Sequence, residues 1–146
     1  MENDVVVLIA EDDSGHFQLI KRNLWLTCVD IDILQFKNGQ EILDFLFSDD
    51  SETRLKEGKQ YVLLLDIRMP KVDGLEVLSR IKADEKLKKI PVIMLTTTTE
   101  TDMIEQCYQL GCSYYIVKAV DYHRFMDSVQ SLGEFLSLES MRLAEL

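Results

Sequence analysis

Three unbroken runs of apolar residues constrain the fold of this chain more than any other feature of its sequence. They cover residues 5–10, 61–65 and 92–95. A strand with one solvated face alternates apolar and polar residues, whereas a strand inside a parallel sheet is apolar throughout. The run 61–65 ends on Asp66, and Pro70, Asp73 and Gly74 then supply turn chemistry. The three runs therefore predict buried strands of a parallel sheet, each ending at a polar loop.

The segments between these runs predict helices and two further strands. Apolar residues with helical spacing follow each strand, and the helices begin near Ser14, Asn38, Gly74, Thr97 and Asp121. Glu41 and Glu100 stand three residues after Asn38 and Thr97, which predicts a capping box at each of those two helix starts. Less regular apolar runs at 31–36 and 114–117 predict the remaining strands. Five strands alternating with five helices predict an α/β fold with a doubly wound parallel sheet.

Composition limits the domain organisation, the partners and the compartment. For 146 residues we expect a single domain over 1–146, with no output domain and with 137–146 as a tail or an extension of the last helix. The net charge of −10 argues against nucleic acid and anionic membranes as partners. Cys28, Cys107 and Cys112 lack metal-ligand spacing, and no leader or membrane-spanning run is evident. We therefore expect a reduced, cytoplasmic protein.

Polar residues follow four of the predicted strands at the point where each strand ends. They are Glu11 with Asp12, Asp66, Thr96, and Lys118. Parallel strands bring these ends to one edge of the sheet, where α/β proteins bind ligands. Three carboxylates at that edge repel one another unless a cation lies among them, and Mg²⁺ prefers oxygen ligands. The pattern predicts an Mg²⁺ site at which Asp66 attacks a phosphoryl group.

Each of these residues also has an ordinary structural interpretation. A carboxylate at a strand end often caps a helix or forms a turn, Lys118 would be a surface lysine, and Thr96 would only favour a strand. We favour the functional interpretation because the structural one must hold separately at four strand ends. His16 and His123 have no evident partners, so we expect them to be solvated or packed.

These motifs resemble the receiver domain of two-component response regulators, over essentially the whole chain. The matching segments are 8–13 (LIAEDD), 64–70 (LLDIRMP) with Asp73 and Gly74, 92–96 (VIMLT), and 111–118. The resemblance implies a flavodoxin-like (βα)5 three-layer sandwich whose five-stranded parallel sheet has the order 2-1-3-4-5. It also implies a phosphorylation-dependent switch rather than an enzyme, with output through protein–protein contacts.

The resemblance further implies how phosphate and metal are held. Asp66 would accept a phosphoryl group from a sensor histidine kinase, and Lys118 would pair with the phosphate. Glu11 and Asp12 would form the acidic pair. Mg²⁺ would be bound by Asp12, by Asp66 and by the backbone carbonyl of Arg68.

Switching and tuning residues follow from the same resemblance. Thr96 would bond a phosphoryl oxygen after transfer, and the ring of Tyr115 would turn inward as Thr96 moves. Arg68, Thr97 and Thr98 lie where side chains of the family tune the access of water to the phosphoryl group. Because Arg68 is long and cationic, we expect slow to moderate loss of phosphate.

The chain departs from the family pattern after Lys118. Ala119 stands where the family usually has a proline that is often preceded by a cis peptide bond. A cis bond before a residue other than proline costs about 3 kcal/mol, which favours the trans form. A strained cis bond is the alternative, and it would mark a functional site.

Two features suggest partners. The length of the segment 48–60 and the stretch 81–91 resemble stand-alone receivers that partner phytochrome-type kinases. The apolar residues in 132–146 fit either a helix end folded back on the domain or a homodimer contact. The 4-5-5 face, built by the fourth helix, the fifth strand and the fifth helix, is a second dimer candidate.

Three alternative functions remain open from the sequence. The chain would relay phosphate onward instead of ending a pathway, or it would be a phosphohydrolase of the haloacid dehalogenase type that uses an Asp nucleophile. Those enzymes carry the nucleophile on the first strand with a second Asp two residues later, where this chain has Arg68 after Asp66. A nucleotide or flavin binder needs a glycine-rich phosphate cradle, whereas the first strand here ends in acidic residues.

Overall fold

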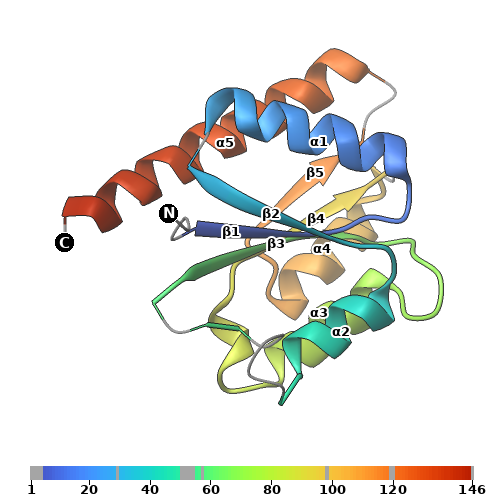
Figure 1. The fold of residues 1–146 in the computed structure, drawn as a ribbon. Helices are drawn as coiled ribbons and strands as arrows, with labels where there is room; N and C mark the ends of the chain where they lie inside the picture. The colour runs from blue at the N-terminus through green and yellow to red at the C-terminus, as the bar shows by residue number, and fades with distance from the viewer. Residues whose placement is uncertain are drawn as a thin grey trace.

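The computed structural model has a central parallel sheet of five strands with helices on both faces (Figure 1). It describes residues 5–28, 30–49, 55–56, 58–97, 99–118 and 121–145, and of 138–145 only the backbone. The strands are β1 (Val5–Ala10), β2 (Ile31–Phe36), β3 (Gln60–Asp66), β4 (Val92–Thr96) and β5 (Tyr114–Val117). The helices are α1 (Ser14–Thr27), α2 (Gly39–Leu46), α3 (Gly74–Lys82), α4 (Thr101–Leu110) and α5 (Tyr122–Glu145), with a 3₁₀ turn at Leu87–Lys89.

The strands lie in the order β2-β1-β3-β4-β5, and all neighbouring pairs are parallel. This confirms the doubly wound sheet predicted from the alternation of elements and the order implied by the receiver resemblance. The chain first builds outward from β1 to β2 and then continues on the other side of β1 with β3. Such a switch point opens a crevice at the carboxyl ends of β1 and β3, where ligands of this architecture bind.

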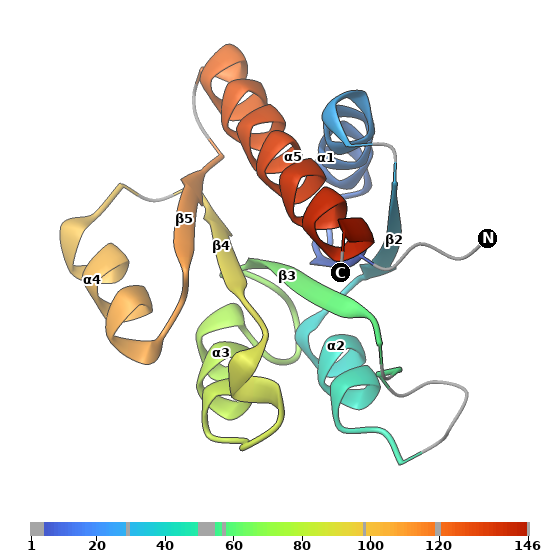
Figure 2. The same ribbon diagram turned by 90° about the vertical axis from the view of Figure 1, so that its left-hand side faces the viewer.

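The two faces of the sheet explain why its central strands are apolar throughout. Helices α1 and α5 cover one face, and α2, α3 and α4 cover the other (Figures 1 and 2). Alternate residues of β1 enter different cores: Val5, Val7 and Ile9 pack with the α1 and α5 side, and Val6, Leu8 and Ala10 pack with the other. Burial on both faces therefore replaces the polar–apolar alternation of a one-sided strand.

Carboxylate and amide side chains begin most of the helices. Asp13, Asn38 and Asp73 each accept a hydrogen bond from the backbone N–H three residues later, at 2.9 Å. The predicted Asn38 cap is confirmed, although the Glu41 carboxylate reaches back to the N–H of Lys37 and not to that of Asn38. Asp121 likewise accepts from the N–H of His123 at 2.9 Å, at the start of α5.

The capping box predicted from Thr97 and Glu100 is wrong. Helix α4 begins at Thr101, Glu100 is its N-cap residue, and the side chain of Glu100 makes no capping hydrogen bond. The spacing of Thr97 and Glu100 matched the motif, but both residues lie in the loop that connects the end of β4 to the start of α4. A loop of this kind separates Thr96, at the end of the strand, from the helix.

The end of α4 places two cysteines side by side. Gly111 has a left-handed φ of 106°, and the N–H of Cys112 donates to the carbonyl of Cys107 at 3.1 Å. This six-residue closure brings the two side chains together as the apolar contact that usually accompanies such a helix end. Both thiols are buried, and burial raises the pKa of Cys112 to about 11.

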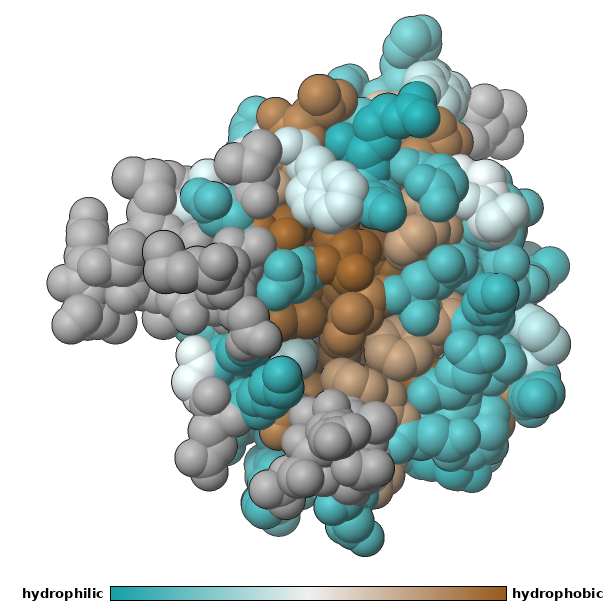
Figure 3. Space-filling view, viewed as in Figure 1, coloured by the Kyte–Doolittle hydropathy of each residue, from teal (hydrophilic) through white to brown (hydrophobic). Residues whose placement is uncertain are grey.

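The outer edge of the sheet at β2 carries exposed apolar surface. Figure 3 views the molecule from the side on which β2 forms the edge of the sheet, and hydrophobic residues gather in the middle of that view. Leu34 on β2 is 41% exposed, and the indole N–H of Trp25 on α1 donates to the carbonyl of Ile31 at 3.3 Å. The indole thus covers one backbone acceptor at the start of an edge that would otherwise be open to pairing.

Helix α5 runs to Glu145, so residues 137–145 continue it. Within the part of the chain that the structure describes, no helix combines the length and hydrophobicity needed to cross a bilayer.

Gly39 allows α2 to lie against the loop that follows β3. A Cβ atom at this position would stand 1.9 Å from the carbonyl oxygen of Val72, which is backbone and has little room to move. Helix propensity alone predicts that Gly39→Ala stabilises the protein by roughly 0.5–1 kcal/mol. We expect the clash to outweigh this gain and to lower the free energy of unfolding by about 2 kcal/mol.

Urea denaturation of Gly39→Ala measures this effect. Gln40→Ala, at the next and exposed position of the same helix turn, is the matched control and should change stability by less than about 0.5 kcal/mol. An unchanged or more stable Gly39→Ala protein would show that this contact is loose.

Candidate functional site

The polar residues predicted at the strand ends lie together at the carboxyl edge of the sheet. Glu11 and Asp12 follow β1, Asp66 ends β3, and β1 pairs directly with β3. Oxygen atoms of these three side chains lie within 4.8 Å of one another. The structure therefore brings the three acidic residues together as predicted, even though more than fifty residues separate Asp66 from the acidic pair.

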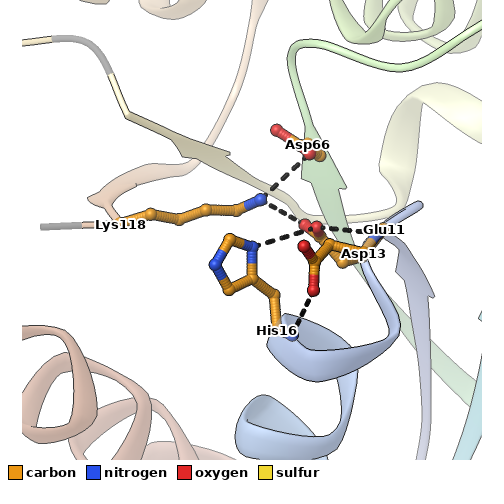
Figure 4. A network of polar contacts seen from close by, with 5 residues as sticks. All are labelled: Glu11, Asp13, His16, Asp66 and Lys118. Atoms are coloured by element: carbon orange, nitrogen blue, oxygen red, sulfur yellow. Dashed lines mark hydrogen bonds and ion pairs between the residues drawn. The ribbon is translucent and has the colours of Figure 1, made fainter. Parts of the chain in front are cut away.

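Lys118, just beyond β5, reaches into this acidic group (Figure 4). Its Nζ donates to Oδ2 of Asp66 at 2.9 Å and makes a short contact with Oε2 of Glu11. Its side chain is only 7% exposed. One ammonium group therefore bridges carboxylates that come from two different strands, and it offsets part of their repulsion.

Glu11 is the most deeply buried of the three acids. Its side chain is fully shielded from solvent, whereas Asp12 is exposed. Its Oε1 accepts a hydrogen bond from the N–H of Asp13 at 3.2 Å. Burial raises the pKa of the Glu11 carboxyl; the hydrogen bond from Lys118 opposes this rise, and the negative charge of Asp66 adds to it.

The loop after β3 is drawn tightly under Asp66. The N–H of Gly74 donates to the carbonyl of Ile67 at 2.7 Å, and a Cβ on Gly74 would lie 2.3 Å from the backbone oxygen of Asp66. In the same loop Lys71 has a positive φ of 69°, and the N–H of Val72 donates to the carbonyl of Pro70 at 2.9 Å. Lys71 is therefore the centre of a strained three-residue turn, of the kind that marks functional loops.

Thr96 and Tyr115 are linked to each other beside the acidic group. Thr96 is buried at the end of β4, and the half-buried Tyr115 on β5 packs against the core under α2 to α4. Burial raises the pKa of the Tyr115 hydroxyl, and the hydrogen bond that its side chain shares with the side chain of Thr96 opposes this rise. The predicted switch pair is thus in contact.

The predicted tuning residues lie differently. The side chains of Arg68 and Thr97 are exposed, so they face the solvent side of the site. Thr98 and the Lys118–Ala119 peptide bond lie outside the described residues. The use of the Arg68 carbonyl as a metal ligand stays a prediction.

His16 is a site residue that the sequence reasoning missed. We expected it to lack partners, but its Nδ1 lies 3.4 Å from Oε1 of Glu11 (Figure 4). The cap at Asp13 turns the start of α1 so that a residue five positions after Glu11 comes back beside it. His123 also has a neighbour, since its ring meets the edge of the Tyr122 ring at a centroid distance of 5.8 Å.

The donor set fits a small hard cation. The acidic group offers oxygen atoms alone, from three carboxylates of which one is exposed. Mg²⁺ binds such sites through one or two carboxylates and keeps several waters. Because Asp12 faces solvent, a hydrated ion would enter the site from the side on which Asp12 lies.

Comparison with known proteins settles the family. The family model of the response regulator receiver domain matches residues 7–130. This chain belongs to that family. The probable methanogenesis regulatory protein FilR2 of Methanothrix harundinacea is 34% identical over 138 residues, which span 92% of this chain and 84% of FilR2.

Solved structures agree with this assignment. A response regulator receiver domain from Rhodospirillum rubrum has a TM-score of 0.83 at 35% identity, covering 91% of this chain and 94% of its own. The phosphorylated cyanobacterial phytochrome response regulator RcpA has a TM-score of 0.79 at 30% identity, with 91% and 93% covered. The Mn²⁺-bound form of the response regulator Rcp1 has a TM-score of 0.78 at 30% identity, with 90% and 93% covered.

The family fixes the class of function. A receiver domain is a phosphorylation-dependent signalling switch, and members of the family are generally not enzymes. The receiver domain of this chain is such a switch. The phosphohydrolase and the nucleotide-binding alternatives find no support in these relatives.

The buried charge of Glu11 predicts a pH-dependent stability. Because the folded-state pKa is raised, the protein folds more favourably with Glu11 protonated, and this contribution is lost as the pH rises through that pKa. Without divalent cations we expect Glu11→Gln to raise the free energy of unfolding near pH 7 by about 1 kcal/mol. The difference should begin to shrink as the pH falls through the folded-state pKa of Glu11 and should vanish below the ordinary carboxyl value of 4.5.

Urea denaturation over a pH series, with a chelator present, measures this difference. Glu105→Gln, at an exposed position of α4, is the control and should change stability by less than about 0.5 kcal/mol throughout. A Glu11→Gln protein that is markedly less stable at neutral pH would mean that the Lys118 contact outweighs the cost of burial.

Proposed function

We propose that this protein is a response regulator in which Asp66 accepts a phosphoryl group from a sensor histidine kinase in an Mg²⁺-dependent reaction. The observation that carries the proposal is the position of Asp66. Its carboxylate lies at the mouth of the central strand, in contact with Lys118 at 2.9 Å and beside Glu11 and Asp12. No other aspartate of the described residues combines a strand-end position with both a buried lysine and an acidic pair.

The proposed transfer is a displacement at phosphorus. An oxygen of Asp66 forms the new O–P bond while the bond from phosphorus to the imidazole nitrogen of the donor histidine breaks, and its electron pair stays on that nitrogen. Asp12, Asp66 and the carbonyl of Arg68 would hold Mg²⁺, which would neutralise the phosphoryl oxygens as they approach. Such transfer relies mainly on positioning and on charge neutralisation.

Lys118 and Thr96 supply the contacts from the protein after transfer. Lys118 already touches Asp66, so a short movement of its ammonium group would pair it with a phosphoryl oxygen. Thr96 lies at the end of the neighbouring strand, and its hydroxyl would donate to another oxygen. Because Thr96 is hydrogen-bonded to Tyr115, a movement of Thr96 would also change the position of the Tyr115 ring.

Output through protein contacts follows from this coupling. Tyr115 lies on β5, and a change in its ring position would alter the surface that β5 shares with α4 and α5. Exposed aromatic side chains are present there, at Tyr108 and Tyr114. We propose this face, or the end of α5, as the contact for a downstream protein or for a second copy of the chain.

The upstream partner is proposed from similarity. RcpA is named as a phytochrome response regulator, and two further structural neighbours are named as bacteriophytochrome response regulators. We propose a histidine kinase of the phytochrome type as the donor. Passing the phosphoryl group onward to another histidine is the second candidate role, and the proposed cytoplasmic location suits both.

Acetyl phosphate with Mg²⁺ tests the proposal without the kinase. Intact mass spectrometry should show a gain of one phosphoryl group on the wild type and none on Asp66→Asn. The gain should disappear when a chelator replaces Mg²⁺. Asp73→Asn, a helix-cap acid in the same loop, is the matched control and should still be modified.

The same experiment reports the fate of the phosphoryl group. A long, cationic Arg68 beside the site would shield the phosphoryl group from water, so we expect the added mass to decay slowly after acetyl phosphate is removed. Decay within seconds would contradict the role given to Arg68. Continuous turnover of small phosphate esters would contradict the switch and favour a phosphohydrolase.

A further inference from the structure

The buried carboxylate of Glu11 needs more hydrogen-bond donors than the receiver motif residues supply. Glu11 is a carboxylate with no exposed surface, and its cation, Lys118, is shared with Asp66. In the proposed function Lys118 pairs with the phosphoryl group after transfer. Glu11 would then keep only the N–H of Asp13, at 3.2 Å, unless another donor from the protein serves it.

We propose that His16 is a positioning residue for Glu11. In this role Nδ1 of His16 donates a hydrogen bond to Oε1 of Glu11, which keeps Oε2 directed toward Lys118 and the proposed metal site. This inference rests on the proposed function, because it concerns the geometry of the same acidic group. His16 touches neither metal nor phosphate in this arrangement. It acts through Glu11 alone.

The position of the ring follows from the start of α1. The N–H of His16 donates to Oδ1 of Asp13 at 2.9 Å, and the N–H of Asp13 donates to Glu11. These bonds and the His16–Glu11 contact close a ring of three residues around the helix start. The next residue, Phe17, is buried in the core and anchors the same turn.

The Nδ1 atom itself points to this role. The imidazole is 43% exposed as a whole, yet Nδ1 is shielded from solvent and has no regular hydrogen bond among the described residues. The polar atom in front of it is Oε1 of Glu11, at 3.4 Å. A good N–H···O bond is about 2.9 Å long, so the two groups are half an ångström from a hydrogen bond.

No change in the charge of His16 is needed. A neutral imidazole with its proton on Nδ1 is a donor at that atom and leaves Nε2 to solvent. With two donors on Oε1, the N–H of Asp13 and Nδ1 of His16, the carboxylate cannot rotate freely, which keeps Oε2 directed at the site. Glu11 is not one of the proposed direct ligands, but it belongs to the same acidic group as Asp12 and Asp66. Outer partners of a metal site typically change metal affinity by about 10-fold or more when they are removed.

Titration calorimetry with Mg²⁺ alone tests the inference on the full chain. We expect His16→Leu, which removes the donor, to weaken Mg²⁺ binding roughly 10-fold. We expect His16→Asn to stay close to wild type, because its amide nitrogen lies about where Nδ1 does. His123→Leu, at the other histidine, is the control and should leave the affinity unchanged.

The outcomes separate this inference from the function on which it rests. A wild-type protein that binds no Mg²⁺ would overturn the proposed function. Wild-type affinity in His16→Leu, or equal losses in His16→Leu and His16→Asn, would overturn the role of His16 while leaving that function standing. If His16→Leu does not fold, His16→Gln replaces it, because glutamine places its amide near Nε2 and should also weaken binding.

Discussion

The contact of one lysine with two carboxylates is the interaction on which the site depends. Glu11 and Asp66 are brought together by the pairing of β1 with β3, and both are almost completely shielded from solvent. Two such charges cannot be buried side by side without a cation. The ammonium group of Lys118 supplies part of that charge, and the remaining negative charge makes the site ready for a divalent ion. Such an ion would also offset the negative charge of the phosphoryl group that Asp66 is proposed to accept.

The rest of the fold serves to hold these groups at the same edge. Sheet order places β1 beside β3 and β3 beside β4, so that the acidic pair, the proposed acceptor Asp66 and Thr96 lie at the ends of neighbouring strands. Two glycines then allow the loop after β3 to lie close, Gly74 under Asp66 and Gly39 against Val72. Stability and function are therefore linked at this edge, since the packing that fixes Asp66 also fixes the loops around it.

Much of this arrangement was predictable from the sequence, for identifiable reasons. Continuous apolar runs such as residues 5–10 indicate strands buried on both faces, and a parallel sheet then forces their ends together. Local motifs were less reliable, because the Thr97 and Glu100 spacing fits a capping box that α4 does not use. His16 was missed because its contact with Glu11 depends on the path of the chain through the Asp13 cap, which no spacing rule describes.

A crystal structure of the protein with Mg²⁺ and beryllofluoride, which mimics an aspartyl phosphoryl group, tests the central claim most directly. We expect the adduct on an oxygen of Asp66, Mg²⁺ bound by Asp12 and Asp66, and the Nζ of Lys118 moved from Glu11 to a fluorine atom. An adduct on another residue, or a Lys118 that keeps both of its carboxylate contacts beside the bound adduct, would contradict it.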